Sequence, residues 1–382
     1  MESSSSTVLF LPSPVELQGQ RDHCGVSLVD SSFWQKQTNL PVEFTWSKGD
    51  LVSSHGELME PVVDLEGFFR GDEVATQRAA RIIKDACMSH GFFQVINHGI
   101  DASLISAAHD QIDNFFKLPT SRKLKAQRMP GNMWGYSGAH ADRFCSKLPW
   151  KETLSFGFDD CSLNPMVVNF FNSNLGKDFE QTGIIYQKYC EAMKCLSLGI
   201  TELLAISLGI NDRLHYREFF EEGCSIMRCN NYPTCQASDL ALGTGPHCDP
   251  TSLTILHQDQ VGGLEVFANN RWQSVRPRDD ALVINIGDTF TALSNGKYMS
   301  CLHRAVVNRF TERRSLAFFL CPREDKVVRP PQDLICRQGT RIYPDFTWSD
   351  LLEFTQKHYR SDYATLENFT KWLLTSKPTA KF

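Results

Sequence analysis

The chain has 382 residues, of which 42% are hydrophobic, and it carries a formal net charge of −5. It is long enough to bury a large core, and its acidic balance argues against nucleic acid or an anionic membrane surface as a partner. Its 13 cysteines are odd in number and form no Cys-x-x-Cys motif, and no secretory signal or membrane-spanning segment is evident, so we expect a cytoplasmic, monomeric protein with reduced thiols.

The sequence divides into four expected stretches. Residues 1–58 form a polar, serine-rich N-terminal arm without sustained periodicity. Residues 59–215 form a mainly helical N-terminal region, and residues 216–325 are rich in short strands. Residues 326–382 form a C-terminal helical segment.

The second stretch combines several helices with one strand. Apolar side chains recur every three to four residues over 75–86 and over 104–115, which predicts two helices. Between them, the apolar run 92–96 is typical of a buried strand. A longer helix is expected over 179–208, where Gly209 ends it.

The third stretch contains short segments rich in β-branched and aromatic residues, each bounded by turn-forming residues. These predicted strands are 252–257, 264–267, 272–275, 281–286, 303–308 and 315–320. Many short strands in succession favour an antiparallel barrel. The predicted fold class is therefore α+β: a double-stranded β-helix (jelly-roll) barrel braced by helices, with a mainly helical N-terminal region.

A metal site is predicted in this third stretch. His247 and Asp249 are separated by one residue, and His303 begins a later predicted strand. Because successive side chains of a strand point to opposite faces, His247 and Asp249 share a face and Cys248 points away. Two imidazoles and one carboxylate on one side of a metal ion leave positions open on the other, as in non-haem iron(II) oxygenases. We therefore predict an iron(II) site at His247, Asp249 and His303.

A second pattern lies on the strand that follows His303. Arg313 and Ser315 share a face by the same period of two, and Arg314 points away from it. A guanidinium beside a hydroxyl is suited to clamping a planar carboxylate in a pocket. The pair therefore predicts a carboxylate-binding site.

With these residues identified, the stretch from about 223 to 322 resembles the iron- and 2-oxoglutarate-dependent dioxygenases of plants. The resemblance rests on the triad, on the Arg-x-Ser pair and on the segment 230–235, Asn-Asn-Tyr-Pro-Thr-Cys, which is similar to the family's Asn-x-Tyr-Pro segment. It implies Fe(II) and 2-oxoglutarate as cofactors, O2 as co-substrate and ascorbate as a supporting reductant. The residues that it implies for binding 2-oxoglutarate are Arg313, Ser315, Tyr232 and Asn230.

A narrower resemblance extends over nearly the whole chain. The segment 148–156, Leu-Pro-Trp-Lys-Glu-Thr-Leu-Ser-Phe, is similar to one that marks gibberellin 20-oxidases, and the segments 41–46 and 243–246 add to the likeness. The resemblance implies a diterpenoid acid as substrate and successive oxidation of its carbon 20. The series ends in loss of that carbon, as a step of gibberellin biosynthesis.

A rigid, apolar acid requires a largely hydrophobic pocket with one or two cations. The residues expected to form the apolar wall are Trp150 and Phe156, and those expected to supply the cation are Lys151, Lys147 or Arg143. The alternative for Lys151 is a solvated strand residue that pairs with Glu152.

Two alternative functions stay open. A related plant oxygenase that acts on another gibberellin position, or on a flavonoid or alkaloid, would share the iron and 2-oxoglutarate residues, and only the segment 148–156 speaks against it. A non-catalytic jelly-roll module would bind a small acid or a metal such as zinc without turnover. Such a module is expected to have a damaged triad or Arg-x-Ser pair, and both are intact. The expected partners are therefore a diterpenoid acid, 2-oxoglutarate and O2, with no nucleic acid and no membrane.

Overall fold

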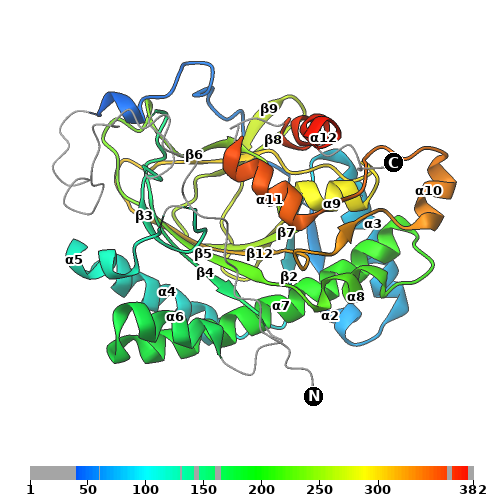
Figure 1. Cartoon of the computed structure of the whole chain (residues 1–382), viewed down its shortest axis with the longest axis horizontal. Coiled ribbons are helices and arrows are strands. Elements are labelled where there is room, and N and C mark those ends of the chain that lie inside the picture. Colours follow the sequence, from blue (N-terminus) through cyan, green and yellow to red (C-terminus); the bar gives the residue numbers. More distant parts are fainter. Residues whose placement is uncertain are drawn as a thin grey trace.

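The structure, a computed structural model, describes residues 40–59, 61–129, 131–141, 146–159, 165–358 and 364–376. Two main β-sheets lie across from each other at the centre, and helices pack around them (Figure 1). The strands are β1 Val62–Asp64, β2 Phe92–Ile96, β3 Gly135–Gly138, β4 Glu152–Phe158, β5 Ser225–Tyr232, β6 Leu242–His247, β7 Leu253–Gln258, β8 Leu264–Ala268, β9 Arg271–Ser274, β10 Leu282–Ile286, β11 His303–Val306, β12 Arg313–Leu320, β13 Val327–Val328 and β14 Phe346–Thr347. The helices are α2 Glu66–Phe69, α3 Glu73–Ser89, α4 Ala102–Phe116, α5 Thr120–Lys123, α6 Met166–Leu175, α7 Glu180–Leu208, α8 His215–Glu221, α9 Asp288–Leu293, α10 Gln332–Gln338, α11 Trp348–Lys357 and α12 Thr365–Ser376, with short 3-10 turns at Val42–Phe44, Leu124–Ala126 and Lys177–Phe179.

The two main sheets confirm the predicted jelly-roll barrel. The larger sheet has the strand order β1-β2-β10-β7-β12-β5-β4-β3, and the smaller sheet has the order β6-β11-β8-β9. Neighbouring strands in these sheets are antiparallel apart from β1 and β2, which are parallel. Strands β1 to β4 precede residue 216, so the region expected to be mainly helical also extends the larger sheet.

Strand alternation decides which side chains of the larger sheet reach the barrel interior. On β12, Arg313 and Phe319 line an interior cavity, whereas Arg314 points outward and pairs with Asp113 of α4 at 2.5 Å. Phe318 also lies on the outer face and contacts the ring of Phe158. The outer face of the sheet is thus the face on which helices pack, and the inner face is left for the site.

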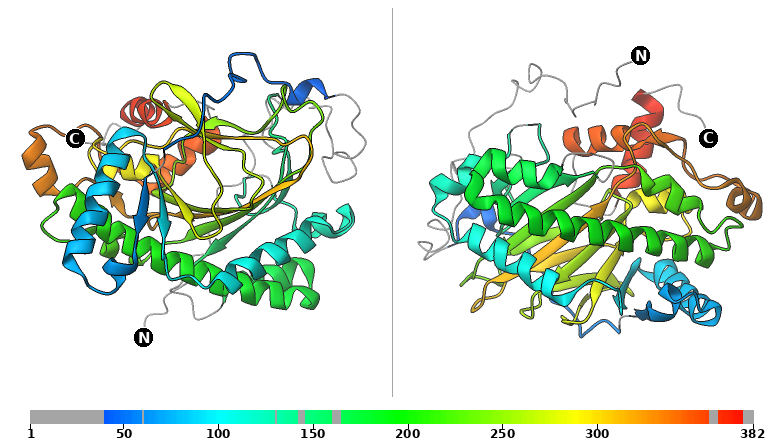
Figure 2. Two further views of the ribbon diagram at one scale, coloured as in Figure 1. Left: turned by 180° about the vertical axis from the view of Figure 1, so that it is seen from behind. Right: turned by 90° about the horizontal axis from the view of Figure 1, so that it is seen from below.

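Helix α7 covers the outer face of the larger sheet, with α4 and α6 beside it (Figure 2). Its limits, Glu180–Leu208, confirm the long helix predicted over 179–208. Gly209 ends it in the left-handed region, at a φ of 67°, where glycine has no side-chain penalty. Gly183 lets α6 come close, because a Cβ atom there would lie 2.7 Å from the Cα of Val168.

The last part of the expected N-terminal arm packs against the barrel. Residues 1–39 lie outside the described residues, but Phe44, Trp46 and Leu58 are buried. The ring of Phe44 meets that of Trp150 edge-on, with the ring centres 5.2 Å apart. Phe44 and Trp46 are too few, and Leu58 lies too far from them in the chain, to give a periodic pattern.

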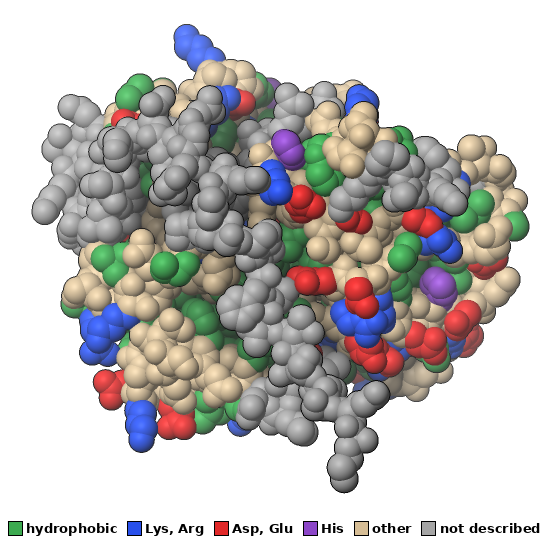
Figure 3. Space-filling view, in the orientation of Figure 1, with side chains coloured by type: hydrophobic (Ala, Val, Ile, Leu, Met, Phe, Trp, Pro, Cys, Tyr) green, Lys and Arg blue, Asp and Glu red, His purple; other side chains and the backbone are tan. Residues whose placement is uncertain are grey.

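The charged surface is mixed. On the face shown in Figure 3, acidic and basic side chains are interspersed rather than gathered by sign.

Among the described residues, no helix combines the length and the apolar character that a membrane crossing requires. Three short helices, α10, α11 and α12, lie in the described part of the region 326–382, in which one C-terminal helical segment was predicted.

Candidate active site

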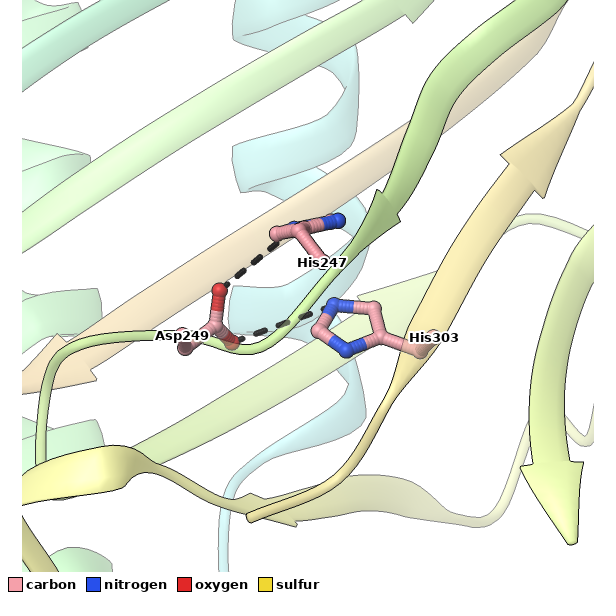
Figure 4. A group of neighbouring side chains, drawn as sticks. All are labelled: His247, Asp249 and His303. Carbon is pink, nitrogen blue, oxygen red and sulfur yellow. Dashed lines mark ion pairs between the residues drawn. The ribbon is translucent and has the colours of Figure 1, made fainter. Parts of the chain in front are cut away.

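Three side chains, two on the smaller sheet and one in the loop that follows its strand β6, converge inside the barrel (Figure 4). His247 ends β6, Asp249 follows in the next loop, and His303 opens β11, where it lies opposite His247. Nε2 of His247 lies 3.6 Å from Oδ1 of Asp249, and Nε2 of His303 lies 3.9 Å from Oδ2 of Asp249. One ligand atom from each residue lies within 4.8 Å of the other two, so the three can bind a single metal ion.

Backbone carbonyls orient both imidazoles. Nδ1 of His247 lies 2.9 Å from the carbonyl oxygen of Gly245, and Nδ1 of His303 lies 3.0 Å from that of Cys301. Because a carbonyl oxygen only accepts, each Nδ1 carries the proton and donates. Each Nε2 is therefore left unprotonated toward the metal position, as metal-binding histidines require.

The electrostatics of the triad suit a cation. Burial, together with the neighbouring imidazole of His303, lowers the pKa of His247 to about 3, so this ligand stays neutral near pH 7. Burial raises the pKa of Asp249, but His303, His247 and a hydrogen bond from Thr254 lower it by more, so the carboxyl group is ionised. A neutral imidazole and an ionised carboxylate are the forms that bind a divalent metal.

The four residues expected to bind 2-oxoglutarate lie together on paired strands. Arg313 on β12 is opposite Tyr232 on β5, and Ser315 is opposite Asn230. The guanidinium carbon of Arg313 lies 4.9 Å from the ring centre of Tyr232, and Asn230 donates to Ser315 Oγ at 3.2 Å. Sequence reasoning and the structure thus bring the same four residues into one cluster.

Arg313 is prepared for an anion. Its side chain is 2% exposed, and its Nη2 donates to Gln258 Oε1 at 2.8 Å. Its Nε and Nη1 are buried and have no acceptor among the described residues. Buried charged donors without acceptors are costly, so a carboxylate at this position would stabilise them. The residues therefore fit the far carboxylate of 2-oxoglutarate.

Lys151 also lines the cavity that contains the triad. Its side chain is buried, and its Nζ donates to Thr244 Oγ1 at 3.0 Å. Glu152 lies on the other face of β4 and pairs with Lys123 at 2.6 Å. The alternative in which Lys151 is solvated and paired with Glu152 is therefore wrong, because alternation along β4 separates the two side chains.

Arg228 is a cavity residue that sequence reasoning missed. It lies on β5, its Nε donates to Ser155 Oγ at 3.1 Å, and its guanidinium carbon is 5.3 Å from the ring centre of Phe319. Burial, with the positive charges of Arg228 and Arg128, lowers the pKa of Lys151 well below its usual value. The signal was available, since Arg228 precedes Asn230 by two residues and so shares its face of the strand.

The two aromatic residues expected in the pocket wall lie elsewhere. Phe156 packs on the outer face of the larger sheet against Phe171 and Tyr186, with ring centres 5.2 and 5.3 Å away. Trp150 is not among the cavity-lining side chains; it packs on Phe44 and donates from Nε1 to the carbonyl oxygen of Thr234 at 3.3 Å. The prediction of an apolar wall from these two residues is therefore wrong.

The other two predicted cations are also not part of the described cavity. Lys147 lies at the surface, with 47% of its side chain exposed, and pairs with Asp50 at 2.7 Å. A residue in an ion pair at the surface does not face the triad, so the prediction for Lys147 is wrong. Arg143 lies outside the described residues.

Comparisons with known proteins agree with this geometry. A model of the 2OG-Fe(II) oxygenase superfamily matches residues 223–322, and a model described as "non-haem dioxygenase in morphine synthesis N-terminal" matches residues 61–174. Gibberellin 20 oxidase 2 of Oryza sativa subsp. indica is 58% identical over 338 residues, which cover 88% of this chain and 86% of that protein. Gibberellin 20 oxidase 2 of Arabidopsis thaliana is 53% identical over 359 residues, covering 94% and 93%.

Solved structures show the same fold. A crystal structure of JOX2 in complex with 2OG, Fe and JA has a TM-score of 0.77 and 29% sequence identity, covering 90% of this chain and 98% of that one. A crystal structure of the dioxygenase for auxin oxidation in rice has a TM-score of 0.66 and 26% identity, covering 81% and 99%. The converging triad, the carboxylate cluster and these similarities together show that the chain belongs to the 2OG-Fe(II) oxygenase superfamily, enzymes that use Fe(II) and 2-oxoglutarate, and within it to the gibberellin 20 oxidase family.

Proposed function

We propose that the protein is a gibberellin 20-oxidase. It oxidises carbon 20 of a gibberellin precursor in successive steps that end in loss of that carbon, with 2-oxoglutarate and O2 consumed at each step. The observation that carries the reaction type is the buried Arg313 guanidinium in the cavity that holds the triad, whose Nε and Nη1 find no acceptor among the described residues. Identities of 53–58% with proteins named gibberellin 20 oxidase support the substrate class.

When bound, Fe(II) with 2-oxoglutarate and O2 supplies an oxidising power that protein side chains do not possess. The side chains bind and orient. Nε2 of His247, Nε2 of His303 and the Asp249 carboxylate hold the metal, and Arg313 with Ser315 fixes the far end of 2-oxoglutarate. The barrel interior keeps bulk water away from the reacting carbon, which limits side reactions.

We propose that cavity cations pair with a carboxylate of the diterpenoid substrate. Arg228 is the better placed of the two, because it lines the cavity beside Phe319, away from the cluster of Arg313 and Tyr232. Lys151 lies beside Tyr232, near the cluster assigned to 2-oxoglutarate, and serves as the second cation. The observation that supports both is that the two side chains line one cavity. Burial there lowers the pKa of Lys151, so a bound carboxylate would stabilise its charged form.

The function is tested by incubating the purified protein with Fe(II), ascorbate, 2-oxoglutarate and a panel of gibberellin precursors. Mass spectrometry is expected to show products oxidised at carbon 20, then products that lack it, with succinate formed in proportion. Succinate without substrate conversion, or oxidation at a different carbon, would favour the related plant oxygenase instead.

A metal-site variant separates catalysis from non-catalytic binding. His247→Ala is expected to abolish turnover and Fe(II) binding while circular dichroism shows an unchanged fold, because it removes one of three ligands. Retained binding of one equivalent of iron with full activity would contradict the site.

We also propose that the enzyme acts as a monomer in the cytoplasm. The ten described cysteines form no disulfides, which is typical of a reducing compartment. Light scattering after gel filtration tests the first point, and the location of a fluorescent fusion tests the second.

A further inference from the structure

A second cavity lies on the inner face of the larger sheet, and its wall includes Met133, Trp134, Ile226 and Trp348. It neighbours the cavity of the triad. Ile226 precedes Arg228 by two residues on β5, so both side chains share the inner face. Ile226 is also opposite Phe319 on β12, which lines the cavity of the triad. The two cavities therefore follow one another along the same wall of the barrel.

Trp134 forms a flat part of this wall. Its indole lies against Gly157 on β4, where an added Cβ would lie 2.6 Å from Cζ2 and 2.9 Å from Cε2. Gly157 is opposite Ile226 of β5, so the indole covers the strand pair next to the cavity. Any side chain at position 157 would displace the ring.

The indole N–H of Trp134 is left without an acceptor in the part of the chain that the structure describes. Its Nε1 is buried, and none of the described residues accepts a hydrogen bond from it. The buried Trp150, by contrast, donates from Nε1 to the carbonyl oxygen of Thr234. A buried donor without an acceptor is unfavourable, so an oxygen atom of a ligand within reach of the Trp134 N–H would stabilise it.

The distance from the metal suits a rigid ring system. Thr254 on β7 hydrogen-bonds to Asp249, and β4 is separated from β7 by β12 and β5. Three strand spacings of about 4.8 Å place Trp134 roughly 14 Å along the sheet from the triad. A substrate of several fused rings, with one end at the metal, would extend into the second cavity.

We propose that the second cavity binds the end of the substrate remote from the oxidised carbon, and that Trp134 Nε1 donates a hydrogen bond to a hydroxyl oxygen on that end. This inference rests on the proposed function, since it takes a diterpenoid acid as the substrate. It makes Trp134 the residue that distinguishes a hydroxylated precursor from one without the hydroxyl group.

The test uses two diterpenoid acids that differ only in a hydroxyl group remote from carbon 20. The wild-type protein is expected to show a higher kcat/KM for the hydroxylated acid, mainly through a lower KM. Trp134→Phe keeps an aromatic ring and removes the N–H, so the preference should fall about fivefold to tenfold, the value of one hydrogen bond. Trp150→Phe, at a buried tryptophan outside both cavities, should leave the ratio unchanged.

A second variant changes Gly157, the residue on which the indole of Trp134 lies. Gly157→Ala is expected to displace the indole and raise the KM for both acids severalfold, while the KM for 2-oxoglutarate stays the same. If circular dichroism shows that Trp134→Phe does not fold, Gly157→Ala and the wild-type preference decide the matter.

The proposal is overturned by equal kcat/KM for the two acids in the wild type, by an unchanged ratio in Trp134→Phe, or by an unchanged KM for both acids in Gly157→Ala. Failure of the wild type to oxidise either acid would instead reject the gibberellin 20-oxidase function.

Discussion

Thr254 donates a hydrogen bond from Oγ1 to Oδ2 of Asp249 at 2.5 Å. Thr254 belongs to β7 of the larger sheet, whereas Asp249 follows β6 of the smaller sheet, so the bond joins the two walls of the barrel at the metal site. Oδ1 of Asp249 is left 3.6 Å from Nε2 of His247. The threonine hydroxyl thus determines how the carboxylate is turned relative to the two imidazoles.

Replacing this hydroxyl should weaken iron binding. Thr254→Val keeps the shape of the side chain but removes the donor, and we expect Fe(II) affinity to fall about tenfold or more, as for other hydrogen bonds that orient metal ligands. Thr254→Ser restores the donor and should bind iron like the wild type. Anaerobic calorimetry measures both constants, and equal affinity of the valine variant and the wild type would refute the role.

Arg313 and its neighbour Arg314 form a matched pair. Arg313→Lys is expected to raise the KM for 2-oxoglutarate about 10- to 100-fold, because an ammonium cannot make the planar two-pronged contact with a carboxylate. Arg314→Lys changes outward ion pairs with Asp113 and Glu312 and should leave that KM nearly unchanged. A larger effect of Arg314→Lys in steady-state kinetics would mean that the strand register is wrong by one residue.

The two cations proposed for the substrate are tested with an acid and its methyl ester. Arg228→Met and Lys151→Met should each lower kcat/KM for the carboxylated diterpenoid about tenfold or more, and lower it less for the ester, since only the acid loses a charge-assisted contact. Lys147→Met serves as the control, because Lys147 pairs with Asp50 at the surface. Equal losses on acid and ester would remove the residue in question as the counter-charge.

A buried histidine pair predicts how stability depends on pH. Nε2 of His109 on α4 lies 2.8 Å from Nδ1 of His257 on β7. Mainly through burial, the pKa of His109 is lowered to about 3 and that of His257 to about 4. In the unfolded chain both have a pKa near 6.5, so below that pH the unfolded state binds protons that the folded state does not.

The free energy of unfolding should therefore be highest above about pH 6.5 and decline as the pH falls toward 4. We expect the free energy of unfolding at pH 5 to be lower than at pH 7.5 by about 1–2 kcal/mol for each histidine. Urea unfolding of the wild type and of a variant with His109→Gln and His257→Asn measures this, and the variant should lose part of the dependence. An identical pH dependence in both proteins would speak against the assignment.

The residues that sequence reasoning placed correctly depend on local geometry. Arg313 and Ser315 are two residues apart on β12, and the period of a strand puts both on one face whatever the remainder of the fold does. Asp249 lies in the loop after β6, so its approach to His247 depends on how the chain turns at the end of that strand. Phe156 was misplaced because alternation states which residues share a face but not which face points inward. All seven residues of β4 are buried, so hydrophobicity along that strand gives no direction.

The sequence by itself determined the candidate metal ligands, the Arg313 and Ser315 pair and the family, because short spacings and segments similar to those of relatives indicate them. The pairing of β6 with β11 and of β5 with β12 brings the distant members of each group together. Only the tertiary structure decided which other side chains line the two cavities beside these residues. Arg228, Trp134 and Thr254 acquire their roles from strand pairings between segments distant in the chain, and such pairings depend on how the two sheets close around one interior.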